Sequence, residues 1–120
     1  MSSAALPLEN ISVVSIATNV PGPVAAARLT ELGATVTKVE PPSGDLVARV
    51  APNYYAELTA RQEVVTLDLK TDEGSVALEA LLSLADVFIT SHRPSALDRL
   101  GLGWDAIHAR HPRLCQVAIV

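Results

Sequence analysis

Residues 11–40, ISVVSIATNVPGPVAAARLTELGATVTKVE, show the clearest structural pattern in the chain. It begins with an apolar, β-branched run, ISVVSIA, which is typical of a buried strand. A turn leads into PVAAARLTEL, residues 23–32, which predicts a helix. Pro23 suits the first helical position, and Gly33 suits the residue that follows the last turn. TVTKVE, residues 35–40, predicts a second strand, so this stretch is expected to form a βαβ unit with parallel strands.

The rest of the chain continues this alternation. We expect strands at residues 63–69, 86–91 and 114–120, helices at 71–85, 95–100 and 104–110, and one or two helical turns within 53–60. Residues 41–62 are less regular, because three prolines and a glycine interrupt them. The helix at 71–85 is the clearest, since Thr71 can cap it and Asp72 and Glu73 lie in its first turn, where the helix dipole favours negative charge.

Strands that alternate with helices predict an α/β fold, here a Rossmann-like three-layer domain with a mostly parallel sheet that spans residues 1–120. The composition agrees, because 49% of the residues are hydrophobic and only 3% are aromatic, which suits a parallel sheet covered by alanine-rich helices. Ligands of such sheets bind beyond the carboxyl ends of the strands. The segments TNVPGP, EPPSGD, DLKTDEG and TSHRPS should therefore meet at one edge.

Charge and hydropathy narrow the classes of function. The net charge of −4, without a basic run, argues against nucleic-acid binding. The N-terminus MSSAALPLEN lacks the basic and apolar regions of a secretory signal, and no apolar run is long enough to cross a bilayer. Cys115, the only cysteine, lies in the apolar run LCQVAIV and is predicted to be a small buried residue. We expect a cytoplasmic protein that acts without a membrane or a nucleic acid.

The first turn and the third strand end suggest a binding site. A dinucleotide-binding turn needs G-x-G-x-x-G, whereas TNVPGP has only Gly22, although Glu40 occupies the position of a ribose-binding acid. A domain that binds NAD is therefore the weaker alternative. Lys70 lies just before a predicted helix N-terminus, an arrangement that can bind a phosphate. A solvated surface lysine is the other interpretation of Lys70.

Polar donors also follow the fourth predicted strand. They are Ser91, His92, Arg93 and, one or two helical turns later, Arg99. Together they could hold an anionic or nucleotide ligand, although a histidine in a loop is often ordinary polar surface. His108 and His111 lack the spacing and the companions of a metal site. The sequence has no nucleophile elbow, no P-loop and no H-E-x-x-H motif, so it predicts a binding edge without a visible catalytic residue.

Residues 8–45, LENISVVSIATNVPGPVAAARLTELGATVTKVEPPSGD, resemble the opening of the family III CoA-transferases. That family includes formyl-CoA transferase, the carnitine–CoA transferases and the α-methylacyl-CoA racemases. Three later pieces agree in the same order: VVTLDLKTDEG, ADVFITSHRPSALDRLGLGWDAI and HPRLCQVAIV. The resemblance covers about residues 7–120.

The resemblance implies a pocket for coenzyme A at the predicted edge. In this family the pocket uses the first turn, the segment that ends in the strand-end lysine, the loop after the fourth strand and one further arginine. The matching residues are Val20, Pro21, Leu67, Asp68, Leu69, Lys70, Ser91, His92, Arg93 and Arg99. The prolines after Glu40 would stiffen a loop beside the nucleotide part of CoA.

The resemblance also implies an activity. Family members move CoA between an acyl-CoA and a free carboxylic acid through an aspartyl anhydride, without a metal, and they form interlocked homodimers. The acyl-accepting aspartate is expected beyond residue 120, so we assign no catalytic residue here and expect this chain alone, an N-terminal part, to be inactive. The racemase branch and a non-catalytic nucleotide-binding or interaction module remain alternatives. The last strand is expected to be an unpaired sheet edge that favours association.

Overall fold

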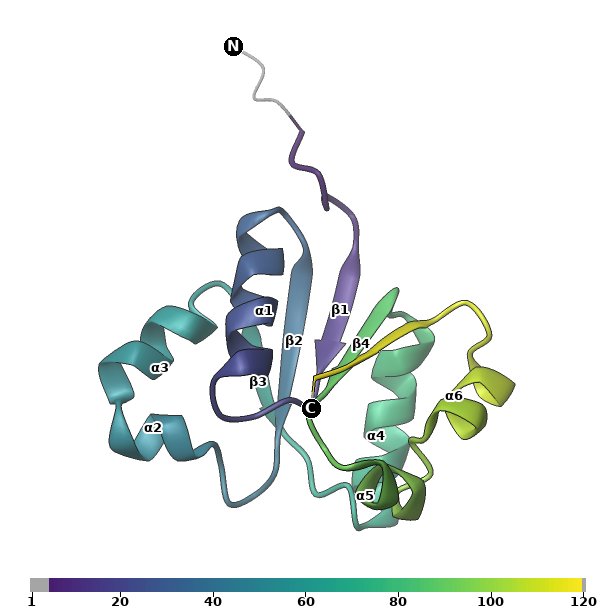
Figure 1. Ribbon diagram of the computed structural model, residues 1–120. Helices are drawn as coiled ribbons and strands as arrows, with labels where there is room; N and C mark the ends of the chain where they lie inside the picture. The colour runs from purple at the N-terminus through teal and green to yellow at the C-terminus, as the bar shows by residue number, and fades with distance from the viewer. Residues whose placement is uncertain (1–4, 120) are drawn as a thin grey trace.

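The structure is a computed structural model that describes residues 5–119, and it contains one five-stranded sheet. The strands are β1 (Ser12–Ser15), β2 (Thr35–Glu40), β3 (Glu63–Thr66), β4 (Val87–Thr90) and β5 (Cys115–Ala118). They lie in the order β3-β2-β1-β4-β5, and every neighbouring pair is parallel (Figure 1). The predicted α/β class with a parallel, Rossmann-like sheet is confirmed.

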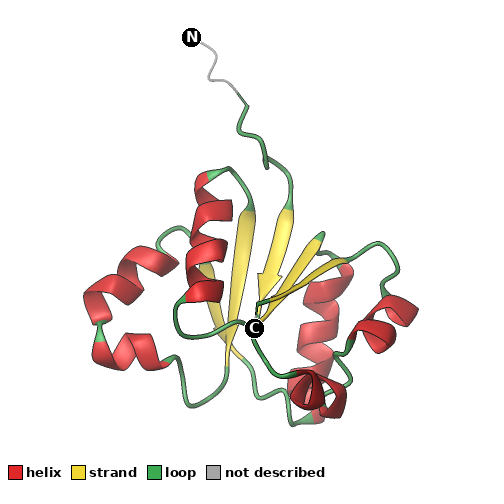
Figure 2. Cartoon of the chain, viewed as in Figure 1, coloured by secondary structure: helices red, strands yellow, loops and turns green. Residues whose placement is uncertain are grey.

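Helices cover both faces of the sheet (Figure 2). They are α1 (Pro21–Glu31), α2 (Leu46–Val50), α3 (Pro52–Thr59), α4 (Asp72–Ser83), α5 (Pro94–Arg99) and α6 (Trp104–Arg110). Helices α1, α2 and α3 lie on one side, and α4, α5 and α6 on the other. None of the helices within residues 5–119 combines the length and the apolar character that a bilayer crossing needs.

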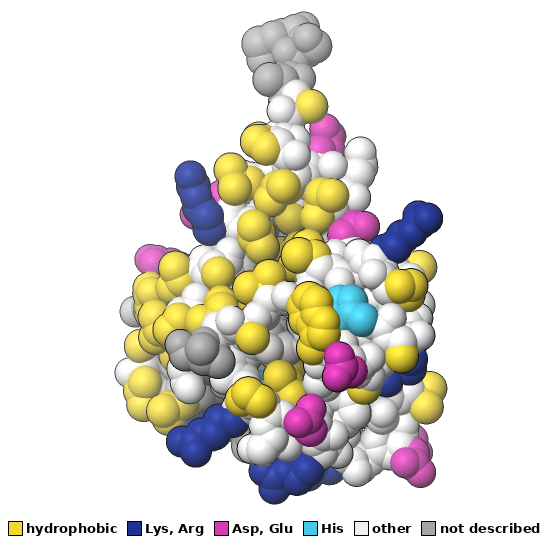
Figure 3. Space-filling view, turned by 45° about the vertical axis from the view of Figure 1, so that its right-hand side comes forward, with side chains coloured by type: hydrophobic (Ala, Val, Ile, Leu, Met, Phe, Trp, Pro, Cys, Tyr) yellow, Lys and Arg dark blue, Asp and Glu magenta, His cyan; other side chains and the backbone are white. Residues whose placement is uncertain are grey.

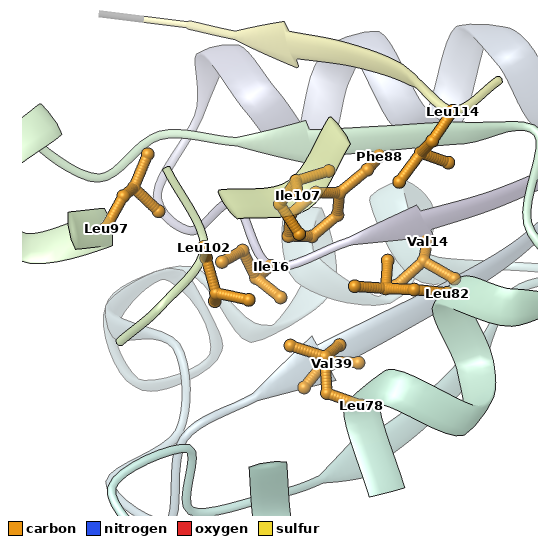
Figure 4. Packing of buried hydrophobic residues seen from close by; sticks show 10 residues of the cluster. All are labelled: Val14, Ile16, Val39, Leu78, Leu82, Phe88, Leu97, Leu102, Ile107 and Leu114. Atoms are coloured by element: carbon orange, nitrogen blue, oxygen red, sulfur yellow. The ribbon is translucent and has the colours of Figure 1, made fainter. Parts of the chain in front are cut away.

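Each face of the sheet has its own core, because successive strand residues point to opposite sides. The core toward α4, α5 and α6 is formed by Val14, Ile16, Val39, Leu78, Leu82, Phe88, Leu97, Leu102, Ile107 and Leu114. Figure 4 shows these side chains filling the space between sheet and helices. The core toward α1 is smaller and is built around Val13, Val36 and Ile89, with Ala26 from the helix. Its small residues allow α1 to lie close to the sheet.

The structure differs from the sequence prediction in several places. Helix α1 begins at Pro21, so Pro23 is its third residue and not the first helical position, and the strand predicted at 63–69 ends at Thr66. The irregular region holds two helices, α2 and α3, where only one or two helical turns were expected. Cys115 was predicted to be buried, and this was wrong, because its side chain is exposed. Cys115 pairs with Val87 in register, on the α1 side of the sheet, and α1 packs chiefly on β1, β2 and β4. No helix in the described part of the chain therefore covers the face of the edge strand β5 on the α1 side, which is called its bare face below.

Candidate functional site

A cleft of about 890 Å³ opens at the carboxyl ends of β1, β2 and β3. Its walls are the ends of β1 and β2, the loop between β2 and α2, the start of α2, the loop between β3 and α4, and α5. Volumes of 300–1,000 Å³ are typical of small-molecule sites, and this edge is where open parallel sheets bind their ligands. The cleft therefore lies where the strand order predicts a binding site.

Six of the ten predicted binding residues line this cleft. They are Leu67, Asp68, Leu69 and Lys70 from the loop between β3 and α4, together with His92 and Arg99. Val20 and Pro21 do not line it, but they follow directly after Thr18 and Asn19, which do. Ser91 and Arg93 do not line it either, but they flank His92, which does. The structure thus brings the predicted segments together at one edge of the sheet.

The turn after β1 is fixed by close packing and by a cross-strand hydrogen bond. A Cβ at Gly22 would lie 2.3 Å from the Cβ of Ala17, so only glycine allows the first turn of α1 to approach the end of β1 this closely. The amide of Thr18 donates to Ser91 Oγ at 3.2 Å, which joins the ends of β1 and β4. Ser91 therefore holds the rim of the cleft together.

The loop between β3 and α4 is folded tightly against the first turn of its helix. Thr71 Oγ1 donates to the carbonyl oxygen of Asp68 at 2.8 Å and accepts from the amide of Gly74 at 3.1 Å, so the predicted cap is confirmed. A Cβ at Gly74 would lie 1.9 Å from the Asp68 carbonyl oxygen. This packing points the N-terminus of α4, which is the positive end of the helix dipole, toward the cleft beside Lys70.

The cleft carries a local excess of positive charge. Arg49, Lys70 and Arg99 line it, against the two acids Asp68 and Asp72, so three cations minus two anions leave +1. The whole chain has a net charge of −4. Figure 3 shows Lys and Arg side chains at the lower end of the molecule, where the strands of Figure 1 end. This local field favours an anionic ligand.

His92 contributes a neutral imidazole to the cleft. Its Nδ1 is buried and has no hydrogen-bond partner among residues 5–119. Burial lowers the pKa of His92 below its ordinary value of 6.5, which favours the uncharged ring at neutral pH. An uncharged imidazole offers one donor and one acceptor, so it suits an uncharged polar group better than a phosphate.

The end of β2 is buried on the other side of the sheet. Lys38 Nζ lies 2.5 Å from Asp45 Oδ2 and 3.2 Å from Glu40 Oε2, and Tyr55 Oη donates to Glu40. Lys38 and Asp45 are each only 2% exposed. Glu40 is thus engaged inside the protein, which removes the ribose-binding acid that the NAD alternative needs.

Sequence reasoning missed part of the cleft. Arg49 and Leu46 line it from α2, which was not predicted. Ser43 and Gly44 line it from the EPPSGD loop, which was expected at this edge. One signal was available, because Asp45 precedes the apolar run LVARV in the manner of an N-cap residue. Its side chain does accept from the amide of Val47. No local pattern indicated that Arg49 would face the cleft.

Comparisons with known proteins agree with this geometry. Residues 8–120 match the family described as CoA-transferase family III. The chain is 31% identical over 121 residues to succinyl-CoA–D-citramalate CoA-transferase of Chloroflexus aurantiacus, covering 94% of this chain and 30% of that protein. It is 34% identical over 119 residues to formyl-CoA:oxalate CoA-transferase of Streptomyces avermitilis, covering 93% and 29% respectively.

A solved structure has the same fold. The crystal structure of the protein Rv3272 of Mycobacterium tuberculosis matches with a TM-score of 0.89 and 34% sequence identity. The match covers 97% of this chain and 34% of that one. The present chain therefore spans about a third of the length of the proteins that it resembles.

Proposed function

This chain belongs to CoA-transferase family III, and from that membership we propose that its cleft binds coenzyme A as the N-terminal part of an acyl-CoA:carboxylate CoA-transferase. The observation that carries the proposal is the cleft at the carboxyl edge of the sheet, whose excess of cations lies beside the N-terminus of α4. Coenzyme A carries its phosphates at one end, so a site with local positive charge suits that end.

The lining residues suggest which part of the cleft would hold each part of coenzyme A. Lys70 and Arg99 would contact phosphate groups, with Arg49 as a third cation at the opposite wall. Leu67, Leu69 and Leu100 give the same cleft an apolar part, which suits the uncharged pantetheine arm. His92 would offer a neutral hydrogen bond to an amide or a base. The neighbouring Val20, Pro21, Ser91 and Arg93 would shape the rim.

The proposed reaction needs a nucleophilic carboxylate. An aspartate would attack the acyl-CoA thioester to form a mixed anhydride and release the CoA thiolate, which would attack the aspartyl carbonyl to give an aspartyl-CoA thioester and free the first carboxylate. The second carboxylate would attack this thioester to form a new mixed anhydride and release the thiolate again. The thiolate would then attack the acyl carbonyl of the second acid, which gives the new acyl-CoA and regenerates the aspartate. We propose that this aspartate lies in a part of the polypeptide beyond residue 120, so the described residues contribute binding. The two relatives compared above are named CoA-transferases, which favours this branch over the racemases. The homodimer and the cytoplasmic location remain predictions.

Calorimetric titration of the 120-residue chain with CoA, and with NAD as a control, tests the proposal. We expect CoA to bind and NAD to bind much more weakly. Lys70→Ala should weaken CoA binding about tenfold, because it removes one charge-assisted interaction with phosphate. The matched control is Arg113→Ala, which removes an exposed cation that does not line the cleft. Binding of NAD alone, or equal effects of the two variants, would contradict the assignment.

A further inference from the structure

The carboxylate of Asp45 joins three segments of the chain. Its Oδ2 accepts from Lys38 Nζ of β2. Its Oδ1 accepts from the amide of Val47 at the start of α2, at 3.0 Å, and from the amide of Asn19 in the loop after β1, at 3.3 Å. A single buried side chain therefore ties the loop before α2 to the loop after β1.

Both of these loops are walls of the cleft. Asn19 lines it from the loop after β1, and Ser43 and Gly44 line it from the loop before α2. The second wall is short and stiff, because the Gly44 amide donates to the Pro41 carbonyl oxygen at 2.8 Å and Gly44 adopts a φ of +78°, which favours glycine. Asp45 follows this turn directly, so its position fixes where the wall stands.

Asp45 acts from behind the cleft and not within it. Neither Asp45 nor Lys38 lines the cleft, and both are 2% exposed. The cluster of Lys38, Glu40 and Asp45 holds one positive and two negative groups. Such a buried cluster is a poor source of stability, because apolar residues of similar volume often replace buried ion pairs without loss. The Asp45 carboxylate of this cluster instead accepts hydrogen bonds from the Asn19 and Val47 amides.

We infer that Asp45, held in place by Lys38, is a positioning residue that sets the spacing between the two walls of the cleft. The identity of the ligand rests on the function proposed above, but the link between the walls does not. The turn after β1 and the loop before α2 should therefore open together when Asp45 is changed. Ligand binding should then weaken, although no residue that faces the cleft has been altered.

Hydrogen–deuterium exchange of the free chain tests the link without any ligand. We expect Asp45→Asn to raise exchange about tenfold in peptides that cover residues 18–20 and also in those that cover residues 43–47. Lys38→Met/Asp45→Leu replaces the buried pair with apolar side chains and should behave in the same way while the chain stays folded. The control is Glu79→Gln, which breaks an ion pair between α4 and α6 away from the cleft. Faster exchange near residue 47 with residues 18–20 unchanged would overturn the inference.

Calorimetry with CoA then tests the effect on binding. In the double variant we expect the Kd for CoA to rise about tenfold, with unchanged affinity in Glu79→Gln. An unchanged Kd in a folded double variant would overturn the positioning role. If the unaltered chain does not bind CoA, the proposed function fails, and the exchange experiment alone decides whether Asp45 links the walls. The two failures are therefore distinguishable.

Discussion

At the scale of single residues, Lys38 is the only cation in a buried cluster with two carboxylates. Lys38→Met would leave Glu40 and Asp45 buried and facing each other without that cation. Removing one partner of a buried ion pair costs about 3–5 kcal/mol, so we expect a loss of this size in the free energy of unfolding. Lys38→Met/Asp45→Leu should recover part of it, because Glu40 still remains buried without a cation.

Urea denaturation of the two variants measures these changes. The single variant should unfold at a much lower midpoint, with an unchanged m-value. The double variant should return toward the midpoint of the unaltered chain. A single variant as stable as the unaltered chain would mean that water reaches this cluster.

Two carboxylates make stability depend on acid pH. Burial by itself raises the pKa of Asp45, but hydrogen bonds from Lys38 and from the Val47 and Asn19 amides outweigh it and hold that pKa below its ordinary value of 3.8. Burial likewise raises the pKa of Glu79, and Arg110 and His111 outweigh it and hold the pKa below 4.5. A carboxylate whose pKa is lowered by folding stabilises the fold at pH values above its unfolded-state pKa. This stabilisation is lost as the pH falls through its folded-state pKa.

We therefore expect the free energy of unfolding to fall steadily as the pH drops below about 4.5. Asp45→Asn and Glu79→Gln should each flatten this fall, because each removes one carboxylate that takes up a proton on unfolding. Chemical denaturation at several pH values between 2 and 7 checks this. An equally steep fall in both variants would assign the acid sensitivity to other groups.

At the scale of helices and strands, the contact between α4 and the loop before it depends on Gly74. Replacing an exposed helical glycine with alanine usually stabilises a helix by up to about 1 kcal/mol. Here the new Cβ would lie 1.9 Å from a backbone carbonyl oxygen, and relieving such a clash costs about 1–3 kcal/mol. The cost of the clash should exceed the gain in helix propensity, so Gly74→Ala is expected to destabilise the chain and to displace Lys70.

Urea denaturation checks the sign of this change. Ala80→Gly, at an exposed position of the same helix, is the control for helix propensity alone. Both substitutions should lower stability, although propensity predicts opposite signs for them. A more stable Gly74→Ala variant would show that the loop moves aside at little cost.

The elements themselves were largely predictable from the sequence, because apolar runs and caps are local signals. Every predicted strand and helix forms, and α6 has the predicted limits. Helix α2 was missed, since its five residues lie in a region interrupted by prolines. The buried state of Lys38 could not be predicted, because its partner Asp45 is brought to it by a turn. The last strand is a sheet edge, as predicted, but Cys115 was misassigned because an apolar run does not reveal that no helix in the described part of the chain covers that face of the strand.

The same limit applies to the binding site. The segments that form the cleft were predictable, because the carboxyl ends of parallel strands must meet at one edge. Which side chains of these segments face into the cleft was harder to predict. Lys70 and Arg99 line the cleft as predicted, whereas Arg93 does not, and Arg49 was not anticipated. Side-chain direction depends on the local backbone of each loop, which a single sequence does not specify.

At the scale of the whole molecule, the two edges of the sheet differ in chemistry. The edge strand β3 reads EVVT and carries an acid, whereas β5 reads CQVA and has no charged residue. Charges on an edge strand oppose pairing with another chain, so β5 is the edge that pairs more readily with a second chain. Its bare face adds to this, because Cys115 is exposed and Val117 is 41% exposed. Figure 3 shows a band of hydrophobic side chains on the side of the molecule turned forward there.

The 120-residue chain by itself should therefore associate as its concentration rises, with β5 as the contact. Val117→Lys places a charge on the bare face of this strand and should shift the chain toward the monomer. Val76→Lys is the control, because Val76 is 70% exposed on α4, so the same change in net charge is made on the other side of the sheet. Sedimentation velocity over a range of concentrations measures the difference. If both lysines reduce association equally, net charge is the cause and β5 is not the contact. If only Val117→Lys does so, the bare face of β5 is the surface through which copies of this chain meet.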